Sequence, residues 1–241
     1  MSDPTRPAIA VALPGTGSDA DFARRAFESA CAAYDLPFQA VDPDPRAVVA
    51  SYHAALDAAA AVGPVLVTGI SLGAAVAIEW ATRNPQAAFG VVAALPAWTG
   101  AETSECPAAL SAAVTAAQLR ADGLEAVTTR MRASSPAWLA AALAQSWRSQ
   151  WPDLPQALEE AAAYRWPEPP VLAALATPVA VIGAVDDPVH PIAVAEQWSA
   201  LLPQAELHRI TLDELGADPA VLGARGVSAL MRNLVSRNTI T

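Results

Sequence analysis

The chain has 241 residues, 54% of them hydrophobic, which is enough to bury roughly 70–75% of its unfolded surface in one core. Its formal net charge of −10 repels phosphate backbones and anionic lipid surfaces, so neither nucleic acid nor a membrane is an expected partner. The start of the sequence lacks the pattern of a secretory signal, and no apolar run approaches the about 18 residues that span a bilayer, so we expect a soluble, cytoplasmic protein.

Apolar runs bounded by turn residues alternate with alanine-rich segments of helical spacing along most of the chain. This alternation is typical of β-α units and a mostly parallel sheet, and therefore of the α/β fold class. The predicted strands are Ile9–Leu13, Phe38–Val41, Val65–Thr68, Val91–Leu95, Val179–Ile182 and Glu206–Thr211. Helices are predicted over 22–34 and 47–61, and a third from just after Ser71 to about Arg83.

The turn after the first strand reads Leu13-Pro14-Gly15-Thr16-Gly17. Its glycines allow backbone amides to approach a ligand closely. A phosphate-binding loop is disfavoured, because the turn has neither a Lys-Ser/Thr pair nor the G-x-G-x-x-G pattern.

The segment Gly69-Ile70-Ser71-Leu72-Gly73 matches the short pattern G-x-S-x-G. It follows an apolar predicted strand and opens an alanine-rich predicted helix, the setting that presents a serine hydroxyl above the edge of a sheet. Side chains at the two glycines would collide where strand and helix cross. We therefore predict that Ser71 is a nucleophile; the alternative is a structural turn serine.

With this motif in this setting, the sequence resembles the α/β-hydrolase family over nearly its whole length. The resemblance implies a mostly parallel central sheet flanked by helices, with a helical lid insertion. It also implies that the backbone N–H groups of Thr16 and Leu72 form an oxyanion hole. The serine at position 71 excludes relatives that have an aspartate at the corresponding position, such as haloalkane dehalogenases and epoxide hydrolases. Cofactor-free haloperoxidases and C–C bond hydrolases also use a serine and stay as alternatives.

The alternation of predicted strands and helices is interrupted for about 75 residues before the fifth predicted strand. A gap of this length is too long for a simple connection between two strands. We predict a core formed by residues 1–97 and 174–241 and a helical lid or cap formed by residues 98–173, with two or three helices. Its tryptophans could line a pocket for an apolar substrate, or they could bury area against the sheet; an apolar patch there could also form a homodimer contact. Five of the seven tryptophans lie in or beside this segment: Trp98, Trp138, Trp147, Trp151 and Trp166.

Two carboxylates, Asp186 and Asp187, follow the fifth predicted strand in the phrase VIGAVDDPVHP. The carboxyl ends of parallel strands form the edge where α/β sheets hold their sites. The resemblance implies a triad acid here, followed by a small residue or proline and then an apolar-x-Pro turn, which matches Asp187 through Pro191. We select Asp187, with Asp186 as the alternative; a helix-capping aspartate is the structural interpretation.

The resemblance also implies a histidine after the last strand, but residues 213–218 contain none. Three histidines exist in the chain. His53 is expected on a helix flanking the sheet and His208 within the last strand, too early to reach the edge. His190 lies three residues after Asp187 and is the best candidate for the base that a serine nucleophile needs. The alternative is that the base has been lost.

These residues predict a serine hydrolase acting on a small-molecule ester or thioester with a small to medium, largely apolar acyl group, through an acyl-enzyme at Ser71. The alternative is a catalytically impaired, α/β-hydrolase-like protein that binds a small ligand. No cofactor motif or metal-ligand spacing is visible, so no cofactor or metal is expected. Cys31 and Cys106 are expected to be reduced, structural thiols.

Overall fold

A computed structural model describes the backbone of residues 6–238 and the side chains of residues 6–232. The first five and last three residues, which the predicted core includes, lie outside the described residues. The segment predicted as a lid or cap, residues 98–173, is called the cap segment below.

The core of the fold is a six-stranded, fully parallel sheet with the strand order β2-β1-β3-β4-β5-β6. The six predicted strands all form, with ends shifted by at most three residues, and the expected parallel sheet is confirmed. The strands are β1 (Ile9–Leu13), β2 (Phe38–Ala40), β3 (Val65–Ile70), β4 (Ala88–Ala94), β5 (Val179–Ala184) and β6 (Ala205–Ile210).

The central strands are apolar along their whole length because helices cover both faces of the sheet. Every residue of β3 and of β5 is buried. The chain order reverses between β1 and β3, which are neighbours in the sheet. In parallel α/β sheets, ligands bind beyond the carboxyl ends of the strands at such a switch point. A ligand site is therefore expected at the turns that follow β1 and β3.

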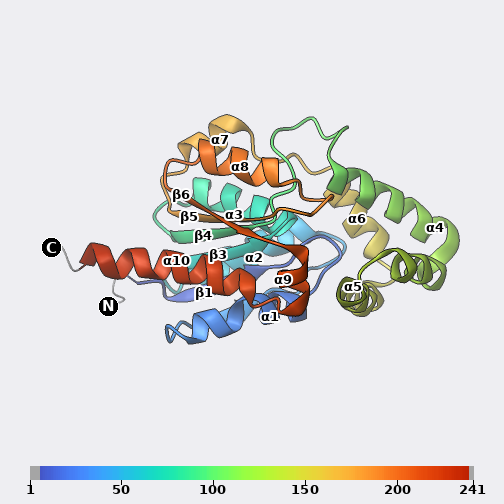
Figure 1. The fold of residues 1–241 in the computed structure, drawn as a ribbon, viewed down its shortest axis with the longest axis horizontal. Coiled ribbons are helices and arrows are strands. Elements are labelled where there is room, and N and C mark those ends of the chain that lie inside the picture. The colour runs from blue at the N-terminus through green and yellow to red at the C-terminus, as the bar shows by residue number, and fades with distance from the viewer. Residues whose placement is uncertain (1–5, 239–241) are drawn as a thin grey trace.

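Helices pack on both faces of the sheet (Figure 1). On one face lie α1 (Ala20–Ala32) and α10 (Val221–Asn238), and on the other lie α2 (Val48–Ala60), α3 (Leu72–Arg83) and α8 (Ile192–Leu201). A short helix, α9 (Leu212–Ala217), links β6 to α10. Among the described helices, none is both long and apolar enough to cross a membrane.

The segment between β4 and β5 is helical and comprises α4 (Pro107–Ser134), α5 (Ala137–Gln150), α6 (Leu154–Ala162) and α7 (Pro169–Ala174). Helix α4 is interrupted at Gly123, whose φ of 76° is not helical. Helices α4, α5 and α6 gather at one end of the molecule in Figure 1 and share a small apolar cluster that includes Leu119, Trp147 and Leu158. Helix α7 instead packs against α3 and α8. The division into core and cap domains stays a prediction.

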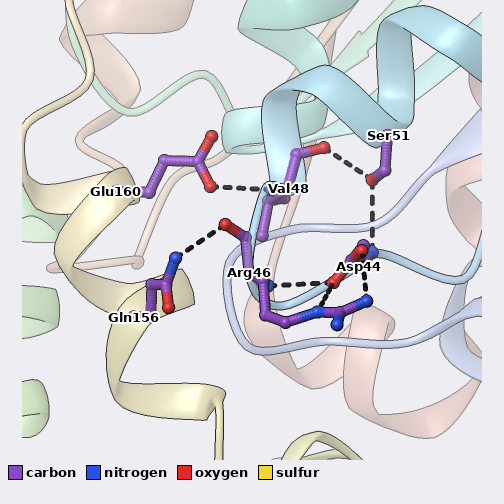
Figure 2. A network of polar contacts seen from close by, with 6 residues as sticks. All are labelled: Asp44, Arg46, Val48, Ser51, Gln156 and Glu160. Atoms are coloured by element: carbon purple, nitrogen blue, oxygen red, sulfur yellow. Dashed lines mark hydrogen bonds and ion pairs between the residues drawn. The ribbon is translucent and has the colours of Figure 1, made fainter.

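Helix α6 is attached to the start of α2 by side chains that bond to the backbone (Figure 2). The Glu160 carboxylate accepts hydrogen bonds from the N–H groups of Val48, at 2.7 Å, and Val49, at 3.1 Å. A carboxylate at this place satisfies free N–H groups and complements the positive end of the helix. Gln156 donates to the carbonyl of Arg46 at 2.7 Å. The cap segment is therefore bonded to the loop between β2 and α2.

Candidate active site

Ser71 lies between β3 and α3 in a backbone conformation that non-glycine residues seldom adopt, with φ 54° and ψ −115°. Such strain costs about 1–3 kcal/mol and is found at functional sites. The neighbouring glycines make the turn possible, because a Cβ on Gly69 would overlap the Gly73 carbonyl and a Cβ on Gly73 would overlap the Leu13 carbonyl. The predicted strand-turn-helix arrangement around Ser71 is thus present.

His190 and Asp187 meet Ser71 from the loop between β5 and α8. The Nε2 atom of His190 lies 3.0 Å from Ser71 Oγ, and its Nδ1 atom lies 2.7 Å from Asp187 Oδ2. The remaining carboxylate oxygen of Asp187 accepts from the N–H groups of Val189, at 2.8 Å, and His190, at 3.1 Å. A serine, an imidazole and a carboxylate are therefore connected in the order that activates a serine hydroxyl.

The Asp187 carboxyl is buried, and burial by itself raises its pKa. The hydrogen bond and charge of His190, together with the backbone N–H groups of Val189 and His190, act in the opposite direction and outweigh burial. The pKa of Asp187 therefore lies below its ordinary value of 3.8, and the group is a carboxylate at neutral pH.

The adjacent carboxylate, Asp186, has a different partner. Its Oδ1 accepts a hydrogen bond of 2.8 Å from the N–H of Leu212, the first residue of α9. Of the two carboxylates that the sequence left open, Asp187 is the one that contacts His190. Neither caps α8, whose N-cap position is Pro191.

Helix α9 occupies the stretch where the resemblance implies a histidine. Thr211 and Glu214 form a reciprocal capping box at its start, with Glu214 accepting from the Thr211 N–H at 2.8 Å and Thr211 Oγ1 accepting from the Glu214 N–H at 3.1 Å. Gly216 lies against the indole of Trp138 from the cap segment, and a Cβ at this glycine would overlap the ring. The T-x-x-E spacing could have revealed this helix from the sequence.

The two other histidines lie away from Ser71, as expected. His53 on α2 has its Nε2 atom 2.8 Å from the guanidinium of Arg83, which ends α3 about 17 Å along the helix from its start beside Ser71. His208 lies within β6 in register with Ile182, below the carboxyl edge of the sheet. Burial lowers the pKa of each imidazole below its ordinary value of 6.5.

The predicted oxyanion donors lie on both sides of the serine. Gly15 to Ser18 form a turn closed by the Ser18 N–H on the Gly15 carbonyl at 3.0 Å, and Thr16 is its second residue. A Cβ at Gly15 would lie 3.5 Å from that of Ser71, which places this turn beside the serine. Leu72 begins α3, so its N–H has no acceptor within the helix. Donation by these two N–H groups to a substrate oxygen stays a prediction.

Three polar side chains that support this turn were not identified from the sequence. Tyr52 donates from its buried hydroxyl to the Pro14 carbonyl at 2.9 Å. Ser146 and Gln150, both on α5, donate to the carbonyls of Gly17 at 2.6 Å and Ser18 at 2.9 Å. The i, i+4 spacing on α5 shows that the two side chains share a helix face, but the sequence does not indicate which loop that face meets.

Two hollows in the described part of the chain are lined by residues other than Ser71, Asp187 and His190. One, of about 460 Å³, lies by the amino ends of β5 and β6, where Pro178 and Gln204 contribute to its wall. That is the edge of the sheet opposite to Asp187. In the described part of the chain, no group of three or more His, Cys, Asp or Glu side chains is arranged to hold a metal ion.

Comparison with known proteins agrees with this architecture. The family model described as "Alpha/beta hydrolase family" matches residues 4–221. No curated protein sequence gives a significant match. MenH from S. aureus has a similar structure, with a TM-score of 0.72 at 15% identity over 94% of both chains.

Two further solved structures share the fold at low identity. An enol-lactonase from Burkholderia xenovorans has a TM-score of 0.72 at 12% identity, covering 94% of this chain and 92% of its own. A thermophilic esterase from Thermogutta terrifontis has a TM-score of 0.71 at 16% identity, covering 93% of this chain and 89% of its own. With the family model spanning most of the sequence and the parallel sheet in place, the chain belongs to the α/β hydrolase family.

Proposed function

We propose that the protein is a serine hydrolase that cleaves esters or thioesters through an acyl-enzyme at Ser71. The observation that carries the proposal is the connection from Ser71 Oγ to His190 Nε2 at 3.0 Å and from His190 Nδ1 to Asp187 Oδ2 at 2.7 Å. Both distances are within the range that general-base activation of a hydroxyl needs.

In this mechanism Ser71 Oγ attacks the acyl carbonyl while His190 Nε2 takes the hydroxyl proton. Asp187 holds the Nδ1–H tautomer and stabilises the imidazolium that forms. The N–H groups of Thr16 and Leu72 bind the oxyanion of the tetrahedral intermediate. His190 then protonates the leaving alkoxide or thiolate, and in the second half it activates the water that releases the acid.

The substrate class follows from charge and composition. A chain with a net charge of −10 disfavours polyanionic substrates. Trp147 and Leu158, which are buried in the apolar cluster of the cap segment, lie close to Gly17, so the cap covers this side of the loop beside Ser71 with apolar groups. These features favour an uncharged, small to medium, largely apolar acyl group.

The binding-protein alternative rested on the missing histidine after β6, and it predicted a His190 ring directed away from Ser71. The 3.0 Å contact between His190 and Ser71 supports the hydrolase instead. Cofactor-free haloperoxidase and C–C bond hydrolase activities use the same serine, and a substrate panel separates them from ester hydrolysis.

The test is labelling of the purified protein with a fluorophosphonate, alongside turnover of p-nitrophenyl esters and thioesters of increasing acyl length. Ser71→Ala and His190→Ala should each abolish labelling and lower kcat by about 10⁴-fold or more. His208→Ala, a histidine away from Ser71, is the matched control and should retain both. An unmodified protein that neither labels nor turns over any ester or thioester would refute the proposal.

A further inference from the structure

Helix α5 of the cap segment carries two polar side chains that are withdrawn from water. Ser146 is 1% exposed and Gln150 is 6% exposed. A buried polar group without a hydrogen-bond partner costs about 1–3 kcal/mol, so such groups persist where they have partners. Both side chains have partners outside their own helix, and both partners lie in the loop between β1 and α1.

The bonds from α5 reach two successive carbonyls of this loop. Ser146 Oγ donates to the Gly17 carbonyl at 2.6 Å, and the N–H of the same peptide group, from Ser18, donates to the Gly15 carbonyl at 3.0 Å. Gln150 Nε2 donates to the next carbonyl, that of Ser18, at 2.9 Å, and to Ser146 Oγ at 2.9 Å. The Gly17–Ser18 peptide group is thus held at both ends, and the turn that contains Thr16 is closed.

Packing reinforces these bonds. Trp147, between the two polar residues of α5, is 5% exposed and lies so close to Gly17 that a Cβ there would be 3.0 Å from its Nε1. Gly17 also has a φ of 68°, which side-chain-bearing residues rarely adopt. The contact with Trp147 and the backbone conformation of Gly17 therefore restrict the position of the turn between α5 and the edge of the sheet.

From this geometry we infer that α5 is a positioning element for catalysis: Ser146 and Gln150 fix the turn that aims the Thr16 N–H at the substrate oxyanion. This inference rests on the proposed function, because it names what orients a group of that same site. An oxyanion donor contributes only when it is held at the position where charge develops, so loosening the turn should lower the rate of the chemical step rather than substrate binding.

The chain offers, for each residue, a control of the same type at an exposed position. Ser149 is also on α5, and its hydroxyl bonds to the carbonyl of Ser146 in the same helix at 2.9 Å. Gln156 on α6 makes the same kind of bond as Gln150, from a side-chain amide to a core carbonyl, but to Arg46 in the loop between β2 and α2 (Figure 2). Neither control touches the turn of residues 15–18.

The experiment compares Ser146→Ala with Ser149→Ala, and Gln150→Met with Gln156→Met, for p-nitrophenyl ester turnover and thermal unfolding. We expect Ser146→Ala and Gln150→Met each to lower kcat by about 10-fold, with KM changed by less than about twofold. Fluorophosphonate labelling should slow in parallel. Both controls should keep kcat and the labelling rate within about twofold of the unmodified protein.

Three results would overturn the inference separately from the proposed function. If the unmodified enzyme turns over esters and the folded Ser146 and Gln150 variants match their controls in kcat, α5 does not position the turn. A loss confined to KM, or a loss equal in variants and controls, would also refute it, because that pattern indicates general weakening of the cap segment. Absence of turnover and labelling in the unmodified protein would refute the proposed function and this inference together.

Discussion

Replacing each of the two adjacent carboxylates by its amide distinguishes a triad acid from a structural one. The variants are Asp187→Asn and Asp186→Asn, the same substitution at neighbouring positions. Asp187 Oδ2 faces Nδ1 of His190, whereas Asp186 Oδ1 faces the N–H of Leu212 in α9. The structure predicts a large loss of kcat for the first variant and a small one for the second.

The magnitude for Asp187→Asn follows from its hydrogen bonds. An asparagine oxygen can either keep the two N–H bonds from Val189 and His190 or turn to face the imidazole. Each net hydrogen bond contributes about 1 kcal/mol, so keeping both is favoured by about 2 kcal/mol, or roughly 30-fold. The amide NH₂ then faces Nδ1 and stabilises the Nε2–H tautomer, which cannot accept the Ser71 proton.

Loss of the negative charge that stabilises the imidazolium adds to this tautomer effect. Together they should lower kcat by about 10⁴-fold, with little change in KM. Asp186→Asn retains an oxygen for the Leu212 N–H and should stay within about fivefold of the unmodified enzyme, which corresponds to about 1 kcal/mol. Steady-state ester hydrolysis, with circular dichroism to verify folding, measures both. Equal losses in the two variants, or a larger loss in Asp186→Asn, would refute this assignment of roles.

Two further predictions concern stability. Glu160→Ala leaves the N–H groups of Val48 and Val49 without their carboxylate, and it should lower the free energy of unfolding by about 2 kcal/mol and Tm by about 4–8 °C in calorimetry, with kcat retained. Because burial lowers the pKa of His208 below 6.5, the unfolded chain binds this proton more tightly, and acidification from pH 7.5 to 5.5 should cost stability that a His208→Gln variant does not lose. Identical slopes of Tm against pH in the two proteins would contradict the second prediction.

The sequence identified the parts of the fold that depend on local pattern. Strands β3 and β5 read as continuous apolar runs because both of their faces are covered, and the start of α3 follows from the G-x-S-x-G turn before it. The sequence did not predict contacts between segments that are far apart along the chain. Nothing near Ser146 or Gln150 in the sequence indicates that they meet the loop after β1, because that contact depends on how α5 lies over the sheet edge.

The sequence selected Asp187 over Asp186 from the residues that follow it, but the partner of each carboxylate depends on side-chain direction, which spacing does not give. Asp186 and Asp187 differ by one position in the same turn, and the residues that follow favoured Asp187 while leaving Asp186 as the alternative. In the structure the Asp186 carboxylate points toward α9, and the Asp187 carboxylate points toward His190. The candidacy of His190 came from its nearness to Asp187 along the chain, and its approach to Ser71 required the tertiary arrangement of β3 and β5.

The position of His190, on the same loop as Asp187, is related to how the cap segment contacts the core. Because Asp187 Oδ1 binds the N–H groups of Val189 and His190, the carboxylate and the imidazole are oriented within one short turn and need nothing from the loop after β6. That loop is then available to form α9, where Gly216 accommodates the indole of Trp138 from α5. The same helix, α5, bonds to the turn beside Ser71 at its other end. The chain thus combines a histidine on the same loop as Asp187 with a cap segment whose helix α5 contacts both the loop after β1 and helix α9 after β6.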